Sequence, residues 1–232
     1  MNGTPRGTIG ENPLLQHIQQ GKHRRTAYSP VIMALAAVAN AASAPIEPEK
    51  FAKIMDEMLP DTKCDGKTPD CRTATQAAPF IQKSMARYQI NSTNEMAAII
   101  SLMAFESGNF TYKRNMFPGR PGQGTANMQM ANFNFEYAKS IPCLQSKVSN
   151  VTTVEGASNA TLNYILSLVT VDKYNFGSGP WFYTTKCLPE SRDALEKNVD
   201  TGFETYMKCV GVSVTEDRKA YLTRAKKAFG LS

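Results

Sequence analysis

Histidine is almost absent from this 232-residue chain. His17 and His23 are its only histidines, and none follows them. A Ser-His-Asp triad, a Cys-His pair and a histidine-ligated metal all need an imidazole, so residues 42–232 lack the means to build them. The five cysteines also lack C-x-x-C spacing, which argues against a zinc site. We therefore expect no metal and no cofactor.

The chain also has no apolar run long enough to span a bilayer. Its best candidate, residues 31–39 (VIMALAAVA), follows a basic cluster at 22–25 and precedes the small-residue site Ala39-Asn40-Ala41. This order is that of a secretory signal peptide. We expect an N-terminal extension with a signal peptide at 1–41, a domain at 42–232 and a secreted, extracellular protein. A buried Ala-rich helix is the alternative.

Charge of one sign is only modestly in excess. The chain has 26 Lys and Arg against 20 Asp and Glu, a formal charge of +6. Cleavage after Ala41 would remove four basic residues and one acid and leave 22 minus 19, or +3. We therefore expect no nucleic-acid partner, and a basic nucleic-acid or membrane-surface protein is a hypothesis that rests on charge alone.

Sequons and cysteines both fit export. N-x-S/T sequons predict glycosylation at Asn91, Asn109, Asn150 and Asn159. Cys64 and Cys71 flank a turn-rich loop, and Cys187 and Cys209 bracket a helical segment, so we propose these two disulfides. Cys143 is left without a partner, and spacing alone does not fix the connectivity.

Helical signals dominate, and strand signals are few. Apolar periodicity predicts about seven or eight helices, with clear segments at 49–59, 73–88, 92–108, 125–140, 159–171, 189–209 and 215–229. Residues 109–124 are rich in Pro and Gly and predict a loop. The expected fold class is all-α or mainly α in a single, monomeric domain.

The stretch from Ser92 to Gly108 is the centre of the functional interpretation. Ser92 and Glu95 have the spacing of a capping box, and the apolar pattern after them predicts a helix buried on one side. Glu106 falls on the same face in the last turn. The helix dipole and partial desolvation would both favour its protonated form, which suits a general acid. The alternative interpretation is that Glu106 is a solvated surface residue.

The only tryptophan, Trp181, lies in an aromatic cluster beside a Gly-Ser-Gly turn. Clustered aromatic rings can stack on the C–H faces of sugars, and they can equally pack in a core. The sequence leaves these two alternatives open.

Three short motifs, in this order, resemble the lysozyme-like superfamily, most closely the soluble lytic transglycosylases and goose-type lysozymes. Glu106-Ser107 resembles their catalytic Glu-Ser, residues 124–130 (GTANMQM) resemble their Gly-Leu-Met-Gln segment, and residues 174–177 (YNFG) resemble their Tyr-Asn-Ala-Gly motif. The middle motif departs from the family at Ala126 and Asn127.

The resemblance implies a lysozyme-like domain with a substrate cleft. It implies a glycosidase that cleaves β-1,4-linked N-acetylhexosamine polymers, peptidoglycan before chitin, with Glu106 as the single catalytic acid and base. The substrate-binding residues would be Ser107, Gln129, Tyr174, Asn175 and Trp181. A second carboxylate is not evident, although Glu136 and Asp172 are candidates for one. The alternative is a non-catalytic secreted glycan-binding protein or effector on the same fold.

Overall fold

The computed structural model describes residues 45–62 and 64–232, so the expected signal peptide at 1–41 lies outside the described residues. The described part is helical, and its only β pairing consists of two isolated bridges, Arg114 with Gly124 and Gly124 with Gln129. The all-α fold class is therefore confirmed. None of the helices in this described part is long and apolar enough to cross a membrane.

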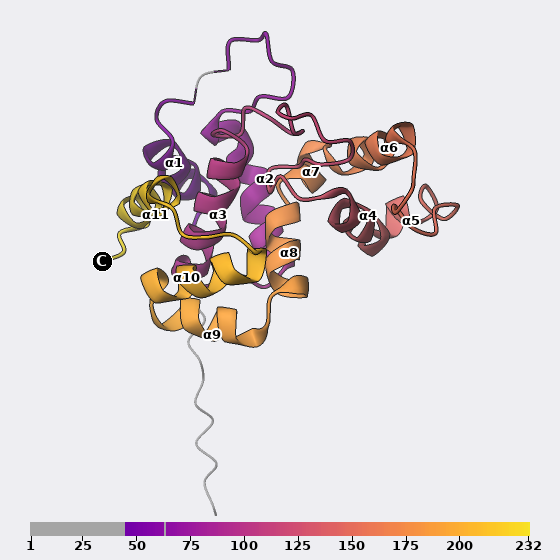
Figure 1. Cartoon of the computed structure of the whole chain (residues 1–232). Helices are drawn as coiled ribbons and strands as arrows, with labels where there is room; N and C mark the ends of the chain where they lie inside the picture. The colour runs from indigo at the N-terminus through magenta and orange to yellow at the C-terminus, as the bar shows by residue number, and fades with distance from the viewer. Residues whose placement is uncertain (1–44, 63) are drawn as a thin grey trace, which may run out of the picture. The chain divides into compact units, whose positions relative to one another are not determined.

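Eleven helices follow one another along the described chain (Figure 1). They are α1 (Pro48–Met58), α2 (Ala74–Arg87), α3 (Thr93–Glu106), α4 (Ala131–Ser140), α5 (Pro142–Gln145), α6 (Asn159–Val169), α7 (Asp172–Asn175), α8 (Ser178–Lys186), α9 (Pro189–Lys197), α10 (Val199–Val210) and α11 (Glu216–Phe229).

Local sequence signals set several of the helix ends. Thr73 and Gln76 form a complete capping box at the start of α2, because each side chain bonds the backbone N–H of the other residue. Asn198 caps α10 by accepting hydrogen bonds from two backbone N–H groups. Gly211 and Gly230 end α10 and α11 with positive φ angles of 81° and 68°, which glycine adopts without strain.

Helix α3 differs from its sequence prediction. Ser92 makes no side-chain capping bond, so the predicted capping box is incomplete. Glu95 is instead buried, where it accepts a hydrogen bond from the Tyr183 hydroxyl at 2.9 Å and pairs with Arg192 at 3.0 Å. Every residue from 97 to 104 is buried, so α3 is a central helix covered on all sides rather than on one. Helices α8 to α11 supply this cover.

Two other predicted helices have different limits. The helix expected at 125–140 begins only at Ala131, because Thr125 and Met128 have positive φ angles that an α-helix does not allow. The helix expected at 189–209 is divided into α9 and α10 at Asn198, whose backbone is extended. The short helices α5 and α7, and α8 as a separate helix, were not predicted.

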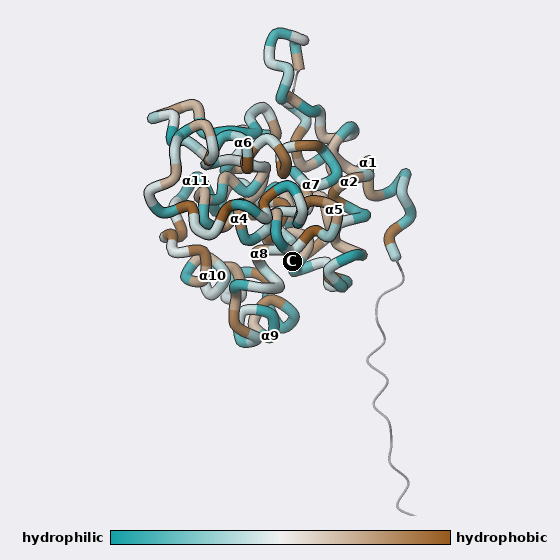
Figure 2. Tube along the Cα trace, turned by 90° about the vertical axis from the view of Figure 1, so that its right-hand side faces the viewer, coloured by the Kyte–Doolittle hydropathy of each residue, from teal (hydrophilic) through white to brown (hydrophobic). Residues whose placement is uncertain are grey.

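The hydrophobic residues form two clusters. One contains α1 to α3 with α10 and α11, and the other contains α4 to α6 with part of α8. Figure 1 shows α4, α5 and α6 together on one side, while α1, α3 and α11 lie on the other. Hydrophobic and hydrophilic stretches alternate along the helices (Figure 2). Helix α8 links the clusters, because Trp181 and Phe182 belong to the second and Tyr183 to the first.

The structure contains the two disulfides that the cysteine spacing suggested. Cys64 is bonded to Cys71 in the loop before α2, with a Cα–Cα distance of 5.6 Å. Cys187 is bonded to Cys209, with a Cα–Cα distance of 5.5 Å, and so fastens the end of α8 to α10. Cys143 is free and exposed.

Candidate functional site

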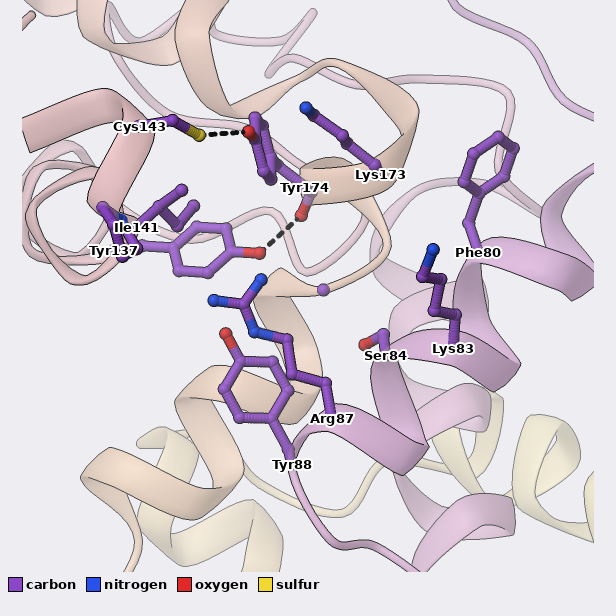
Figure 3. Close-up of a pocket in the computed structure, with 12 residues that line it drawn as sticks. Phe80, Lys83, Ser84, Arg87, Tyr88, Tyr137, Ile141, Cys143, Lys173 and Tyr174 are labelled. Carbon is purple, nitrogen blue, oxygen red and sulfur yellow. Dashed lines mark hydrogen bonds between the residues drawn. The ribbon is translucent and has the colours of Figure 1, made fainter. Parts of the chain in front are cut away.

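A cavity of about 630 Å³ lies where α2 meets the second hydrophobic cluster (Figure 3). Three segments line it: the exposed side of α2 with Tyr88, the region from Tyr137 to Cys143, and the region from Lys173 to Gly177. Pockets that bind small molecules fall in this range of volumes. The cavity is therefore large enough for a small organic ligand.

Helix α2 presents four lining residues at regular spacing. Phe80, Lys83, Ser84 and Arg87 are at positions i, i+3, i+4 and i+7, so they share one face of the helix. Ser84 is buried, and its hydroxyl donates a hydrogen bond to the Phe176 carbonyl at 3.2 Å. This bond fastens α2 to the segment that follows α7. Lys83 and Arg87 are exposed and line the cavity.

The inner wall depends on a close contact between Tyr137 and Gly177. The buried Tyr137 hydroxyl donates a hydrogen bond to the Tyr174 carbonyl at 2.9 Å. A Cβ atom at Gly177 would lie only 2.5 Å from that hydroxyl, so any larger residue would displace the ring. Burial raises the pKa of Tyr137 well above its usual value, and it also raises the pKa of Tyr88. Both phenols therefore stay neutral at physiological pH.

Cys143, Lys173 and Tyr174 form a polar group at one edge of the cavity (Figure 3). Cys143 Sγ lies 2.8 Å from the Tyr174 hydroxyl, and Lys173 Nζ lies 4.5 Å from the centre of the Tyr174 ring. The hydrogen bond with Tyr174 lowers the pKa of the Cys143 thiol, and the nearby positive charges of Lys173 and Arg87 act in the same direction. This edge of the cavity favours negative charge.

The lining as a whole combines apolar walls with cations. Its apolar and aromatic part consists of Phe80, Tyr88, Tyr137, Ile141, Pro142 and Tyr174. Lys83, Arg87 and Lys173 are the charged lining residues, and no carboxylate lines the cavity. None of the three cations forms an ion pair within the described residues. Such a site suits an anion that carries an apolar body.

Asp172 holds α7 in its place beside the cavity. Its carboxylate accepts hydrogen bonds from Lys113 Nζ at 2.5 Å and from Arg72 Nε at 2.9 Å. Burial alone would raise the pKa of Asp172, but these two bonds outweigh it and lower the pKa overall. The charge of Asp172 is matched by these two cations, and it forms no ion pair with the neighbouring Lys173.

Glu106 does not line this cavity. Its carboxylate accepts a hydrogen bond from Arg218 Nη2 at 2.8 Å, and both side chains are largely buried. The Arg218 guanidinium also lies 4.5 Å from the centre of the Phe105 ring. In the structure Glu106 therefore joins α3 to α11. Its expected catalytic role is not tested by any contact and stays a prediction.

The other expected substrate-binding residues are buried and most of them make contacts within the fold, while their expected role stays a prediction. The Ser107 hydroxyl is fully buried and bonds the Met103 carbonyl at 2.6 Å. Gln129 donates to Asn134 at 2.9 Å, and Asn175 is 1% exposed. Trp181 packs on Tyr137 with ring centres 5.0 Å apart. Tyr174 is the only one of these residues that lines the cavity.

The remaining predicted residues lie in separate places, most of them on the surface. Glu136 pairs with Lys186. Asn91, Asn150 and Asn159 are exposed, whereas Asn109 is half-buried and its side-chain oxygen is shielded from solvent. Glycosylation at the four sequons stays a prediction. Among residues 45–62 and 64–232, no group of three or more His, Cys, Asp or Glu is placed to hold a metal ion.

Comparison with known proteins gives one informative relative. The chain is 57% identical over 158 residues to a protein of Fusarium oxysporum (strain Fo5176) named bifunctional dioxygenase (DOX)-epoxy alcohol synthase (EAS). The match covers 68% of this chain and 12% of that protein. The chain therefore spans only a small part of the length of the relative. No protein-family model matches the chain, and no solved structure matches it.

This relative corrects the interpretation drawn from the three short motifs. The resemblance to the lysozyme-like superfamily is wrong, because the similar protein is named for oxygenation and epoxy alcohol synthesis and not for glycan cleavage. The glycosidase function, the non-catalytic glycan-binding alternative and the peptidoglycan and chitin substrates are wrong for the same reason. The chain is similar over about two thirds of its length to a segment of a dioxygenase-epoxy alcohol synthase.

Proposed function

We propose that residues 42–232 form a binding domain for an amphiphilic organic anion, a carboxylate with an apolar carbon skeleton, held in the cavity between α2, α5 and α7. The observation that carries this proposal is the lining itself: three cations without acidic partners stand at the edge of apolar and aromatic walls. A charged head would bind at Lys83, Arg87 and Lys173, and the apolar body would replace water along the aromatic walls.

The name of the relative supports the amphiphilic part of this ligand class, whereas the carboxylate is inferred from the three lining cations alone. An epoxy alcohol is a carbon skeleton that carries an epoxide and a hydroxyl group, so it combines apolar and polar parts as the cavity does. The matched segment is 12% of that protein, which leaves most of its length for other domains. We therefore assign to this segment the binding of a substrate or product and not the oxygenation itself.

We also propose that the protein is secreted. Two disulfides fasten the described part of the chain, and disulfides are characteristic of oxidising compartments. Intact-mass measurement after thiol alkylation without reduction should show one labelled cysteine, Cys143. Labelling of three or five cysteines in protein recovered from the culture medium would contradict this arrangement.

Ligand binding can be tested through Trp181. Because Trp181 packs on Tyr137, which lines the cavity, its fluorescence should change when linear carboxylates of increasing chain length are added. Substituting Lys83→Met or Arg87→Met should weaken carboxylate binding by about tenfold each, because each removes one charge-assisted contact. Lys227→Met, on the exposed face of α11, is the matched control and should bind like the wild type.

Uncharged ligands test whether the lining cations recognise the carboxylate. Primary alcohols of the same chain length should bind more weakly to the wild type and should be insensitive to Lys83→Met and Arg87→Met. Equal affinity for alcohols and carboxylates would show that the three cations do not recognise a ligand. No binding of either class, at any chain length, would refute the binding function.

A further inference from the structure

Two of the three most exposed large apolar side chains among the described residues lie in one loop. Phe117 is 91% exposed and Met116 is 65% exposed, and both lie near the middle of the segment that joins α3 to α4. We call this pair the Met116–Phe117 tip. Seven large hydrophobic residues are exposed in the described chain, and four of them fall between positions 112 and 130. This concentration in one short segment separates the tip from the isolated apolar residues that any surface carries.

The loop that carries the tip is held by its own hydrogen bonds. Asn115 accepts hydrogen bonds from the backbone N–H groups of Gly119 and Arg120 at 2.8 and 3.2 Å. Its own backbone N–H bonds the Gln123 carbonyl at 3.0 Å. At the base, Gly122 N–H bonds the Asn163 side chain at 3.0 Å and ties the loop to α6. The tip is therefore presented to solvent by a closed loop, and inserting it into another phase needs no refolding of the loop.

Arg120 is the cation near the tip that has no acidic partner among the residues that the structure describes. The segment from Ser107 to Val154 contains five basic residues, Lys113, Arg114, Arg120, Lys139 and Lys147, and one acidic residue, Glu136. Lys113 is paired with Asp172, Arg114 with Asp70 and Glu136 with Lys186. Arg120 stands three positions after Phe117, is exposed and forms no ion pair within the described residues. An apolar tip with an unpaired cation at its flank is complementary to a surface that is anionic outside and apolar beneath.

We propose that the Met116–Phe117 tip docks the domain on an anionic phospholipid bilayer, with the two apolar side chains in the interfacial region and Arg120 at the headgroups. A partner protein fits the tip less well, because a stable protein interface buries roughly 800 Å² on each side and the tip offers two main side chains. Insertion into a bilayer needs no such area. This proposal is independent of the cavity and of the ligand bound there.

Vesicle sedimentation of the full-length protein tests the proposal. The wild type should sediment with vesicles of phosphatidylcholine and phosphatidylserine, and less with vesicles of phosphatidylcholine alone. Phe117→Ser should reduce the partition coefficient by at least about tenfold, since it removes the aromatic side chain that would be buried in the bilayer. Arg120→Gln should weaken binding only to the anionic vesicles. Leu188→Ser is the matched control, because Leu188 is 70% exposed outside this loop.

A fluorescent variant reports insertion directly. Phe117→Trp should show a blue-shifted emission with anionic vesicles, while the buried Trp181 supplies a constant background. Failure of the wild type to sediment, or equal sedimentation of the wild type and Phe117→Ser, would overturn the proposal. So would self-association that Phe117→Ser abolishes in the absence of vesicle binding, which would identify the tip as a contact between copies of the chain.

Discussion

The contact between Gly177 and Tyr137 allows a quantitative test of how the cavity is built. In Gly177→Ala the new Cβ would lie 2.5 Å from the Tyr137 hydroxyl, inside van der Waals contact with a buried group. Overpacking of this kind costs about 1–3 kcal/mol. The backbone of Gly177 adds no strain, because its φ of −86° is open to alanine. The whole penalty should therefore come from the tyrosine hydroxyl.

Removing that hydroxyl should relieve the clash. Tyr137→Phe alone loses the 2.9 Å bond to the Tyr174 carbonyl and should cost about 1 kcal/mol. In the double variant the hydroxyl is already absent when the methyl group is added, so the combined loss should be about 1–2 kcal/mol smaller than the sum of the single losses. Urea unfolding followed by circular dichroism measures all four free energies. Additivity within about 0.5 kcal/mol would refute the assigned contact.

Three further perturbations follow from other contacts. Arg218→Met should lower the free energy of unfolding by about 1–2 kcal/mol, because it removes the ion pair between α11 and Glu106, which is partly exposed. An unchanged urea midpoint would contradict this. The pKa of Asp172 is lowered, so its stabilisation is present above its unfolded value of 3.8 and is lost as pH falls through the folded value. Asp172→Asn should therefore unfold more easily than the wild type at neutral pH, with a difference that disappears in acid; a difference independent of pH would exclude the ion pairs as its source. Removing the Cys187–Cys209 disulfide, with a sequence separation of 22, by paired Cys→Ala substitution should lower the free energy of unfolding by about 3 kcal/mol. Removing Cys64–Cys71, with a separation of 7, in the same way should lower it by about 2 kcal/mol. The reverse order would contradict the loop-entropy account.

Periodicity predicted the helices whose signals are local. Helix α2 begins one residue after Thr73, because the capping box that fixes its start lies within four residues of sequence. The division of the helix expected at 189–209 was not predicted, because the sequence does not distinguish Asn198 from other polar residues. Only the structure shows that its side chain caps α10. The late start of α4 was missed because positive φ at Thr125 and Met128 is set by the loop around them and not by their own preferences.

The functional site was missed for a different reason. Glu106 was singled out because it follows an apolar helix, but its partner Arg218 lies 112 positions away, and no local pattern connects them. The spacing of Phe80, Lys83, Ser84 and Arg87 was visible in the sequence, yet an amphipathic helix face of this composition is most often only solvated. What turns this face into a site is the wall opposite it, and that wall comes from segments about 50 to 100 residues further along the chain.

The position of that wall depends on pairing between distant polar groups. Asp172 is joined to Arg72 across 100 positions and to Lys113 across 59, and Ser84 is joined to the Phe176 carbonyl across 92. These bonds fix the ends of α7 against α2, while the aromatic contact between Tyr137 and Trp181 fixes α4 against α8. A ligand in the cavity would contact groups from both sides and would therefore favour the packed arrangement of the two clusters. Occupancy at a hundred times the dissociation constant should then raise the free energy of unfolding by about 2.7 kcal/mol. A cavity that is merely a packing gap would give no such increase.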